Sequence, residues 1–264
     1  MFLIDRYREV RHGTRRLCEP LAIEDYGLQS MPECSPPKWH LAHTTWFFET
    51  FLLAEHEPDF RPHHPQFGFL FNSYYEALGE RWPRPARGLL SRPTVAEVNA
   101  YRDAVDARML RLLETTDSIA PLVELGLQHE QQHQELLLTD LKHAFGLNPL
   151  RPAYRPAALS EPVHEAPPLK WETFDAGVRS IGHVGEGFAF DNELPRHRVF
   201  LEAFALASRP VTVGEYREFL EDGGYDRPTL WLSDGWAARQ HHGWTAPLYW
   251  DPSGSSSPCM GCSH

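Results

Sequence analysis

The chain has 264 residues, of which 42% are hydrophobic, enough for one large domain or two ordinary ones with a buried core. Its formal net charge is −11 at pH 7, and no basic stripe could neutralise a phosphate backbone, so we expect no nucleic-acid partner. No segment approaches the roughly 20 unbroken apolar residues of a membrane span, and the N-terminus becomes charged too soon for a secretory signal. We therefore expect a cytoplasmic protein, without a membrane partner, that acts on small molecules.

Two amphipathic helices are predicted near the N-terminus. Residues 1–17 carry charge on one side, and residues 35–56 follow a proline-broken stretch with Ser35 as the N-cap and Pro36 in the first turn. On the second helix His43 shares a face with large aromatic residues, whereas His40 falls to the side. The other members of that face are Trp39, Trp46, Phe47 and Thr50.

A long loop rich in proline and glycine is predicted over residues 56–93, with a short helix at 70–79. A loop of this length in a compact domain is usually functional. It contains Arg81, Arg84, Arg87 and Arg92, which could hold a substrate carboxylate beside a metal site. A solvated basic loop is the open alternative.

Two further helices complete a predicted four-helix bundle over residues 1–147. Thr94 and Glu97 form a capping box that opens a helix to about residue 116. The next helix covers residues 120–145, with Gly146 as its C-terminal stop. Its predicted apolar face contains Leu122, Leu125, His129, Gln132, His133, Leu136 and Leu137.

The pair His129 and His133 is the strongest chemical signal in the chain. Two imidazoles one helical turn apart can bind the same divalent metal, although two core histidines with hydrogen-bonded neighbours would give the same spacing. The segment also matches the H-E-x-x-H helix of zinc metalloproteases, with Glu130 as general base, but no third ligand follows it. His43 is the better third ligand. Three imidazoles with open positions suit Zn, Fe(II) or Ni.

The rest of the chain changes character. Residues 148–168 are proline-rich and predict a linker, and residues 169–264 predict a second, mixed domain. Short strand-like runs cover residues 169–207, a brief helix is expected at 211–224, and turns follow it. Cys259 and Cys262 have C-x-x-C spacing in a Ser/Gly-rich tail, which we interpret as incidental.

Several long motifs resemble the sulfoxide synthases of ergothioneine biosynthesis. SPPKWHLAHTTWFFETFLL, LFNSYYEALGERWPRPARGLLSRP and HEQQHQELLLTDLKHAF resemble their N-terminal DinB-like bundle. FDNELPRHRVFLEAFALASRPVTVGEYREFLEDGGY resembles the start of their C-terminal domain, which is akin to formylglycine-generating enzymes and sulfatase-modifying factors and has a C-type-lectin-like fold.

The resemblance implies a mononuclear non-haem Fe(II) oxidoreductase. Such an enzyme uses O2 to join cysteine or γ-glutamylcysteine to trimethylhistidine (hercynine), giving a sulfoxide. Carried over by motif, the iron ligands are His43, His129 and His133, and the substrate contacts are Arg84, Arg87 and Gln132. His129→Ala and His133→Ala should each abolish tight metal binding, whereas His40→Ala should not.

The resemblance also implies that the chain is truncated at the C-terminus. The family's second domain continues further and supplies a catalytic tyrosine, so no catalytic residue is assigned. A shifted reading frame could account for the last residues. Two alternatives stay open: a DinB-like metal-dependent thiol S-transferase, and an inactive truncated product.

Overall fold

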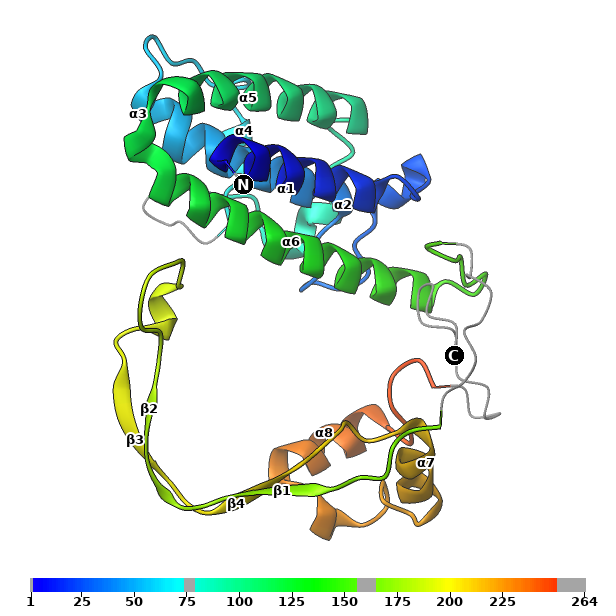
Figure 1. Ribbon diagram of the computed structural model, residues 1–264. Helices are drawn as coiled ribbons and strands as arrows, with labels where there is room; N and C mark the ends of the chain where they lie inside the picture. The colour runs from blue at the N-terminus through cyan, green and yellow to red at the C-terminus, as the bar shows by residue number, and fades with distance from the viewer. Residues whose placement is uncertain (1, 74–78, 156–164, 251–264) are drawn as a thin grey trace. The chain divides into compact units, whose positions relative to one another are not determined.

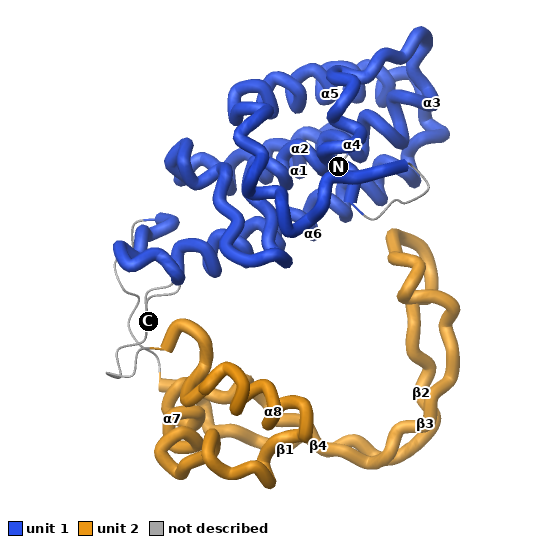
Figure 2. Tube along the Cα trace, turned by 180° about the vertical axis from the view of Figure 1, so that it is seen from behind, with its two compact units in different colours: residues 1–157 blue, residues 158–264 orange. Residues whose placement is uncertain are grey.

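The computed structural model describes residues 2–73, 79–155 and 165–250, and the chain divides into two compact units (Figures 1 and 2). The first unit is residues 1–157 and consists of helices. The second is residues 158–264 and contains short strands and helices. Within the described ranges, none of the helices is both long enough and apolar enough to cross a membrane.

Four long helices run side by side in the first unit (Figure 1). They are α1 (Leu3–Cys18), α2 (Pro37–Phe48), α5 (Val95–Thr115) and α6 (Ala120–Leu147). Shorter elements connect them: a π-helical segment (Glu49–Leu53), α3 (Ala54–His56), α4 (Phe67–Phe71) and 3-10 turns at Ile23–Gly27, Arg84–Leu89 and Asp117–Ile119. The predicted helical bundle is confirmed. Of the helix predicted at 70–79, residues 70 and 71 belong to α4, residues 72, 73 and 79 are not helical, and residues 74–78 lie outside the described residues.

Helix α2 is the innermost helix, since all twelve of its residues are buried. Its aromatic and aliphatic residues are spread around the helix, and Lys38 is its one residue with a fixed charge, so we expect it to be covered on every side. It packs against α5, α6 and α4, and continues through the π-helical segment into α3. The predicted N-cap was one residue early: Pro36 caps the helix in an extended conformation, because a residue that precedes a proline disfavours the helical region.

Helix α5 begins at its predicted capping box, whereas α6 continues past its predicted end. The capping box of α5 is confirmed, with the Glu97 amide donating to Thr94 Oγ1 at 3.2 Å and the Thr94 amide to Glu97 Oε2 at 2.7 Å. Helix α6 ends at Leu147, so Gly146 is not its stop. The end is set by Asn148, which precedes Pro149 and is extended.

A buried ion network fixes the rotation of α6 against α1 and α5. Glu130 on α6 is 0% exposed and forms ion pairs with Arg11 on α1, at 2.9 Å, and with Arg102 on α5. Thr14 also donates to this carboxylate. Burial alone would raise the pKa of Glu130, but the two guanidinium groups outweigh it and bring the pKa to about 2. Glu130 is therefore a carboxylate at neutral pH.

The second unit contains an antiparallel ribbon followed by two helices (Figure 1). Strand β1 (Trp171–Phe174) pairs with β4 (Phe204–Ala207), and β2 (Gly177–Ile181) pairs with β3 (His197–Leu201) in the same continuous register. Helix α7 (Val213–Glu221) lies within the helix predicted at 211–224. Helix α8 (Ser233–His242) lies where turns were predicted. The prediction was wrong because glycine, which is typical of turns, occurs at both ends of this helix: Gly235 is in its first turn, and Gly243 ends it with a φ of 64°.

Candidate metal centre

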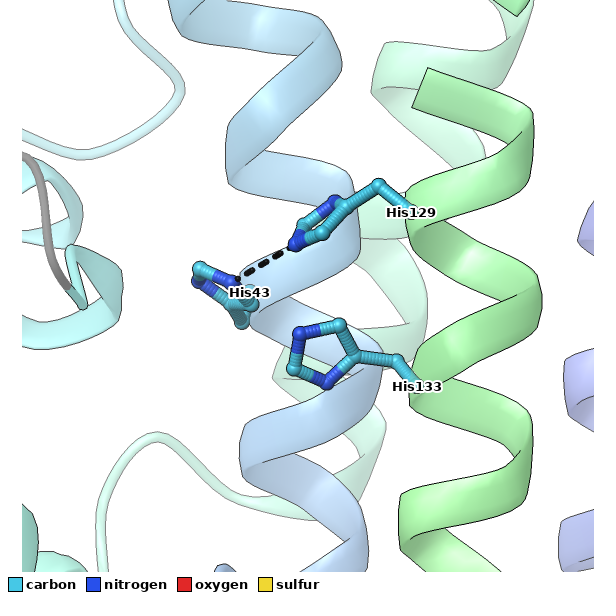
Figure 3. Close-up of side chains that lie close together, drawn as sticks. All are labelled: His43, His129 and His133. Carbon is cyan, nitrogen blue, oxygen red and sulfur yellow. Dashed lines mark hydrogen bonds between the residues drawn. The ribbon is translucent and has the colours of Figure 1, made fainter. Parts of the chain in front are cut away.

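Three histidines from two helices meet on one side of the bundle (Figure 3). His43 comes from α2, and His129 and His133 come from successive turns of α6. One nitrogen of each ring lies within 4.8 Å of one nitrogen of both others, and the Nε2 atoms of His43 and His129 are 3.2 Å apart. Two imidazole nitrogens bound to one ion lie about 3 Å apart, since each metal–nitrogen bond is about 2.0–2.1 Å. The donor set therefore fits a metal ion.

The hydrogen bond of His43 leaves its Nε2 available to bind a metal. Its Nδ1 lies 2.6 Å from the carbonyl oxygen of Phe71, which can only accept, so Nδ1 carries the proton. The lone pair is then on Nε2, which faces His129 (Figure 3). Among the described residues, no partner is found for the buried Nδ1 of His129. The Nε2 atoms of His43 and His129 therefore face each other across the position that a metal ion would take.

Burial holds these rings in the neutral form that binds metals. It lowers the pKa of His129 to about 4 and the pKa values of His43 and His133 well below their ordinary value. The neighbouring imidazoles lower the pKa values of His43 and His133 further. At neutral pH each ring therefore has a lone pair to offer.

The cluster opens into a pocket of about 400 Å³. Its wall includes the residues predicted to contact substrate, Arg84, Arg87 and Gln132. Arg87 is 3% exposed, donates to the hydroxyls of Ser35 at 2.8 Å and Ser73 at 3.2 Å, and stacks at 3.4 Å on the Trp39 ring. The basic loop is therefore not simply solvated: this arginine is built into the pocket wall.

The two histidines of α6 lie at the edge of its buried stripe and not inside it. Leu125 and Leu136, predicted on the apolar face, are 36% and 44% exposed. The buried face of α6 is centred on Glu130 and was not predicted, because a charged residue is not expected at the centre of a buried face. This face comprises Val123, Gly126, Leu127, Glu130, Leu137, Leu141 and Phe145. Because of this rotation, His129 and His133 face the pocket.

The same rotation argues against the metalloprotease alternative. A general base must reach the reacting water beside the metal. The carboxylate of Glu130 is instead enclosed by Arg11, Arg102 and Thr14 and is absent from the pocket wall.

Two wall residues were missed by the sequence reasoning. His40, placed to the side of its helix, is 2% exposed and lies with its Nδ1 2.8 Å from Nδ1 of His133. Its Nε2 lies 3.1 Å from Asp140 Oδ2. The sequence did contain a signal for both residues. His40 precedes His43 by three residues, so the two share one side of α2, and Asp140 follows His133 by seven residues, so these two share one side of α6.

The fold and the site together define a helical bundle with a three-histidine centre that opens into a pocket. Residues 6–137, half of the chain, match the DinB superfamily, and residues 173–260 match the sulfatase-modifying factor enzyme 1-like domain. The chain belongs to the DinB superfamily, and its second unit is of the sulfatase-modifying factor type.

Similar proteins include the hercynine oxygenases of Mycolicibacterium smegmatis, 35% identical over 96% of this chain, and Mycobacterium tuberculosis, 31% identical over 95%. The chain spans 58% and 59% of the length of these two relatives. Ergothioneine biosynthesis protein 1 of Neurospora crassa is 26% identical over 53% of this chain, which is 18% of that relative. The family resemblance seen in the motifs is thereby confirmed.

Proposed function

We propose that this chain provides the iron centre and the thiol-donor pocket of an ergothioneine-forming sulfoxide synthase. In the proposed reaction O2 joins hercynine to cysteine or γ-glutamylcysteine. One C–H and one S–H bond are lost, a C–S and an S=O bond form, and the second oxygen atom leaves as water, so the four electrons removed from the substrates reduce O2. The observation that carries the proposal is the cluster of His43, His129 and His133 in a chain related to hercynine oxygenases.

Fe(II) held by His43, His129 and His133 would supply open coordination positions at which the thiol and O2 can bind. The three rings are neutral by burial, and their lone pairs compensate for the water that the ion gives up. The pocket beside them, at about 400 Å³, is large enough for small polar substrates.

The positive charge of Arg84 and Arg87 in the pocket wall favours a thiol donor that carries carboxylates. Arg87 is held rigidly by Ser35, Ser73 and the Trp39 ring, which fixes its position at the pocket wall. Arg84, in the same 3-10 turn, lines the same wall. We assign the donor carboxylates to these two guanidinium groups, which can make paired hydrogen bonds to a carboxylate. Gln132, which also lines the pocket from α6, is assigned to contact substrate through its amide.

Turnover tests the proposal. The purified chain is loaded with Fe(II) without oxygen and exposed to O2 with hercynine and either cysteine or γ-glutamylcysteine, and the products are read by mass spectrometry. We expect a sulfoxide with one oxygen atom from O2, shown by an 18O2 mass shift, and none from the His129→Ala variant. A zinc-loaded chain that forms no sulfoxide but joins the thiol to an alkyl halide, with release of the halide, would instead establish a thiol S-transferase. Bound iron with no product from either donor would contradict the proposal.

A further inference from the structure

A chain of hydrogen bonds leads from Asp140 to the candidate metal centre through His40. The Ser35 amide donates to Asp140 Oδ2 at 2.8 Å, and the same oxygen lies 3.1 Å from His40 Nε2. The other nitrogen of His40, Nδ1, lies 2.8 Å from Nδ1 of His133. The chain thus joins the loop before α2, a side chain of α2 and two side chains of α6.

Chemistry sets the direction of each bond in this chain. The Asp140 carboxylate can only accept, so His40 must donate through Nε2. A neutral His40 then has its lone pair on Nδ1 and can only accept there, so His133 donates through its own Nδ1. The remaining nitrogen of His133 is left with a lone pair. Figure 3 shows that this nitrogen, the one farther from the backbone, is directed towards His43 and His129.

We propose that His40 and Asp140 are positioning residues, which fix the tautomer and the orientation of His133 for metal binding. Metal-binding histidines usually donate their second N–H to a carboxylate or a carbonyl. His43 follows that pattern through the carbonyl of Phe71. For His133 the carboxylate acts through an intervening imidazole. The inference rests on the proposed metal centre and adds that two residues outside its ligand set determine its affinity.

The burial of His40 supports a functional arrangement over an incidental one. His40 is a polar side chain on the fully buried helix α2, where an unpaired ring nitrogen would be costly. Both of its nitrogens have partners, and both partners belong to α6. Since His40 does not belong to the cluster of metal-reaching atoms, its loss should weaken metal binding without abolishing it.

Cobalt(II) binding tests the proposal without any need for turnover. His40→Leu removes the acceptor for His133 at similar volume, and Asp140→Leu leaves His40 in place but removes the group that fixes its tautomer. We expect each to weaken Co(II) binding by about 10–100-fold, because that is the usual effect of removing such a partner. His40→Gln should recover most of the affinity, since its amide oxygen can accept from His133. His12→Leu, a histidine change at an exposed position of α1, is the control and should bind like the wild type.

The outcomes separate this inference from the proposed centre. The visible absorption of bound Co(II) reports its ligand set, and His129→Leu should lose it. If His129→Leu loses the signal while His40→Leu and Asp140→Leu both bind as tightly as the wild type, the positioning role is wrong and the metal centre stands. Equal weakening in His40→Leu and His40→Gln would also contradict it. If the wild type binds no Co(II), both proposals fail. Should His40→Leu not fold, as judged by circular dichroism, Asp140→Leu and His40→Gln decide.

Discussion

The carboxylate of Glu130 forms a buried ion pair with the guanidinium group of Arg102, one residue along α6 from a histidine of the candidate centre. His129 and Glu130 therefore face different parts of the molecule: the imidazole lines the pocket, and the carboxylate lies in the interior of the bundle. The ion network with Arg11 and Arg102 thus sets the rotation of the helix that carries two of the three histidines.

Glu130→Gln should destabilise the protein by about 3–5 kcal/mol, because it leaves Arg11 and Arg102 buried without a full counter-charge. Glu135→Gln changes an exposed residue of the same helix and should alter stability by less than about 0.5 kcal/mol. Urea unfolding measures both. Equal, small effects would show that the network does not hold the helix in place.

Gly126→Ala should separate α6 from α2. A Cβ at this position would lie 2.7 Å from Phe48 Cε1 and 2.8 Å from Phe47 Cε1, and both rings are buried. We expect a loss of about 1–3 kcal/mol from overpacking, which the better helix propensity of alanine, about 1 kcal/mol, offsets only in part. Gly68→Ala, in α4 with nothing within 4 Å of the added atom, is the matched control and should not destabilise. Thermal unfolding of the pair decides, and a Gly126 variant as stable as its control would contradict this packing.

Cys18 should be unreactive in the native protein. It is 2% exposed, and burial raises its pKa to about 12. Because the folded pKa lies above that of the unfolded chain, stability from this thiol is present below about pH 8.5 and is lost as the pH rises towards 12. Iodoacetamide at pH 8 should label the Cys18 peptide only after unfolding, as read by mass spectrometry. Labelling of the native chain at the rate of the unfolded chain would contradict the burial.

Arg87→Lys should weaken binding of the thiol donor without removing the metal. A lysine cannot make both hydroxyl contacts and stack on Trp39 at the same time. Hydrogen bonds to charged groups contribute about 1.5–3 kcal/mol, so we expect a loss of about 10–100-fold in donor affinity. Calorimetry with γ-glutamylcysteine on the metal-loaded protein measures it, and Arg92→Lys, at an exposed position, serves as the control. An unchanged affinity in the Arg87 variant would exclude the assigned contact.

Local sequence patterns predicted most of the bundle, because the start of a helix and its buried face depend on residues that are close together in the chain. The capping box at Thr94 and the core face of α5 need only residues three or four positions apart. The same holds for the pair His129 and His133, which the structure brings together with His43.

Features that depend on distant partners could not be predicted in this way. Glu130 looks like a surface residue until Arg11 and Arg102, from two other helices, neutralise it. This displaced the predicted apolar face of α6 by part of a turn. For His40 the three-residue spacing from His43 was visible in the sequence, but its two partners, which are on another helix, were not. Cys259 and Cys262 lie outside the described residues.

Anaerobic titration with Fe(II) tests the central claim most directly. We predict one tightly bound ion per chain in the wild type, and loss of tight binding in each of His43→Ala, His129→Ala and His133→Ala with the fold retained by circular dichroism. His40→Ala should bind more weakly than the wild type but still bind one ion. If His43→Ala bound iron as tightly as the wild type and His40→Ala bound none, the assignment of the centre to His43, His129 and His133 would be contradicted.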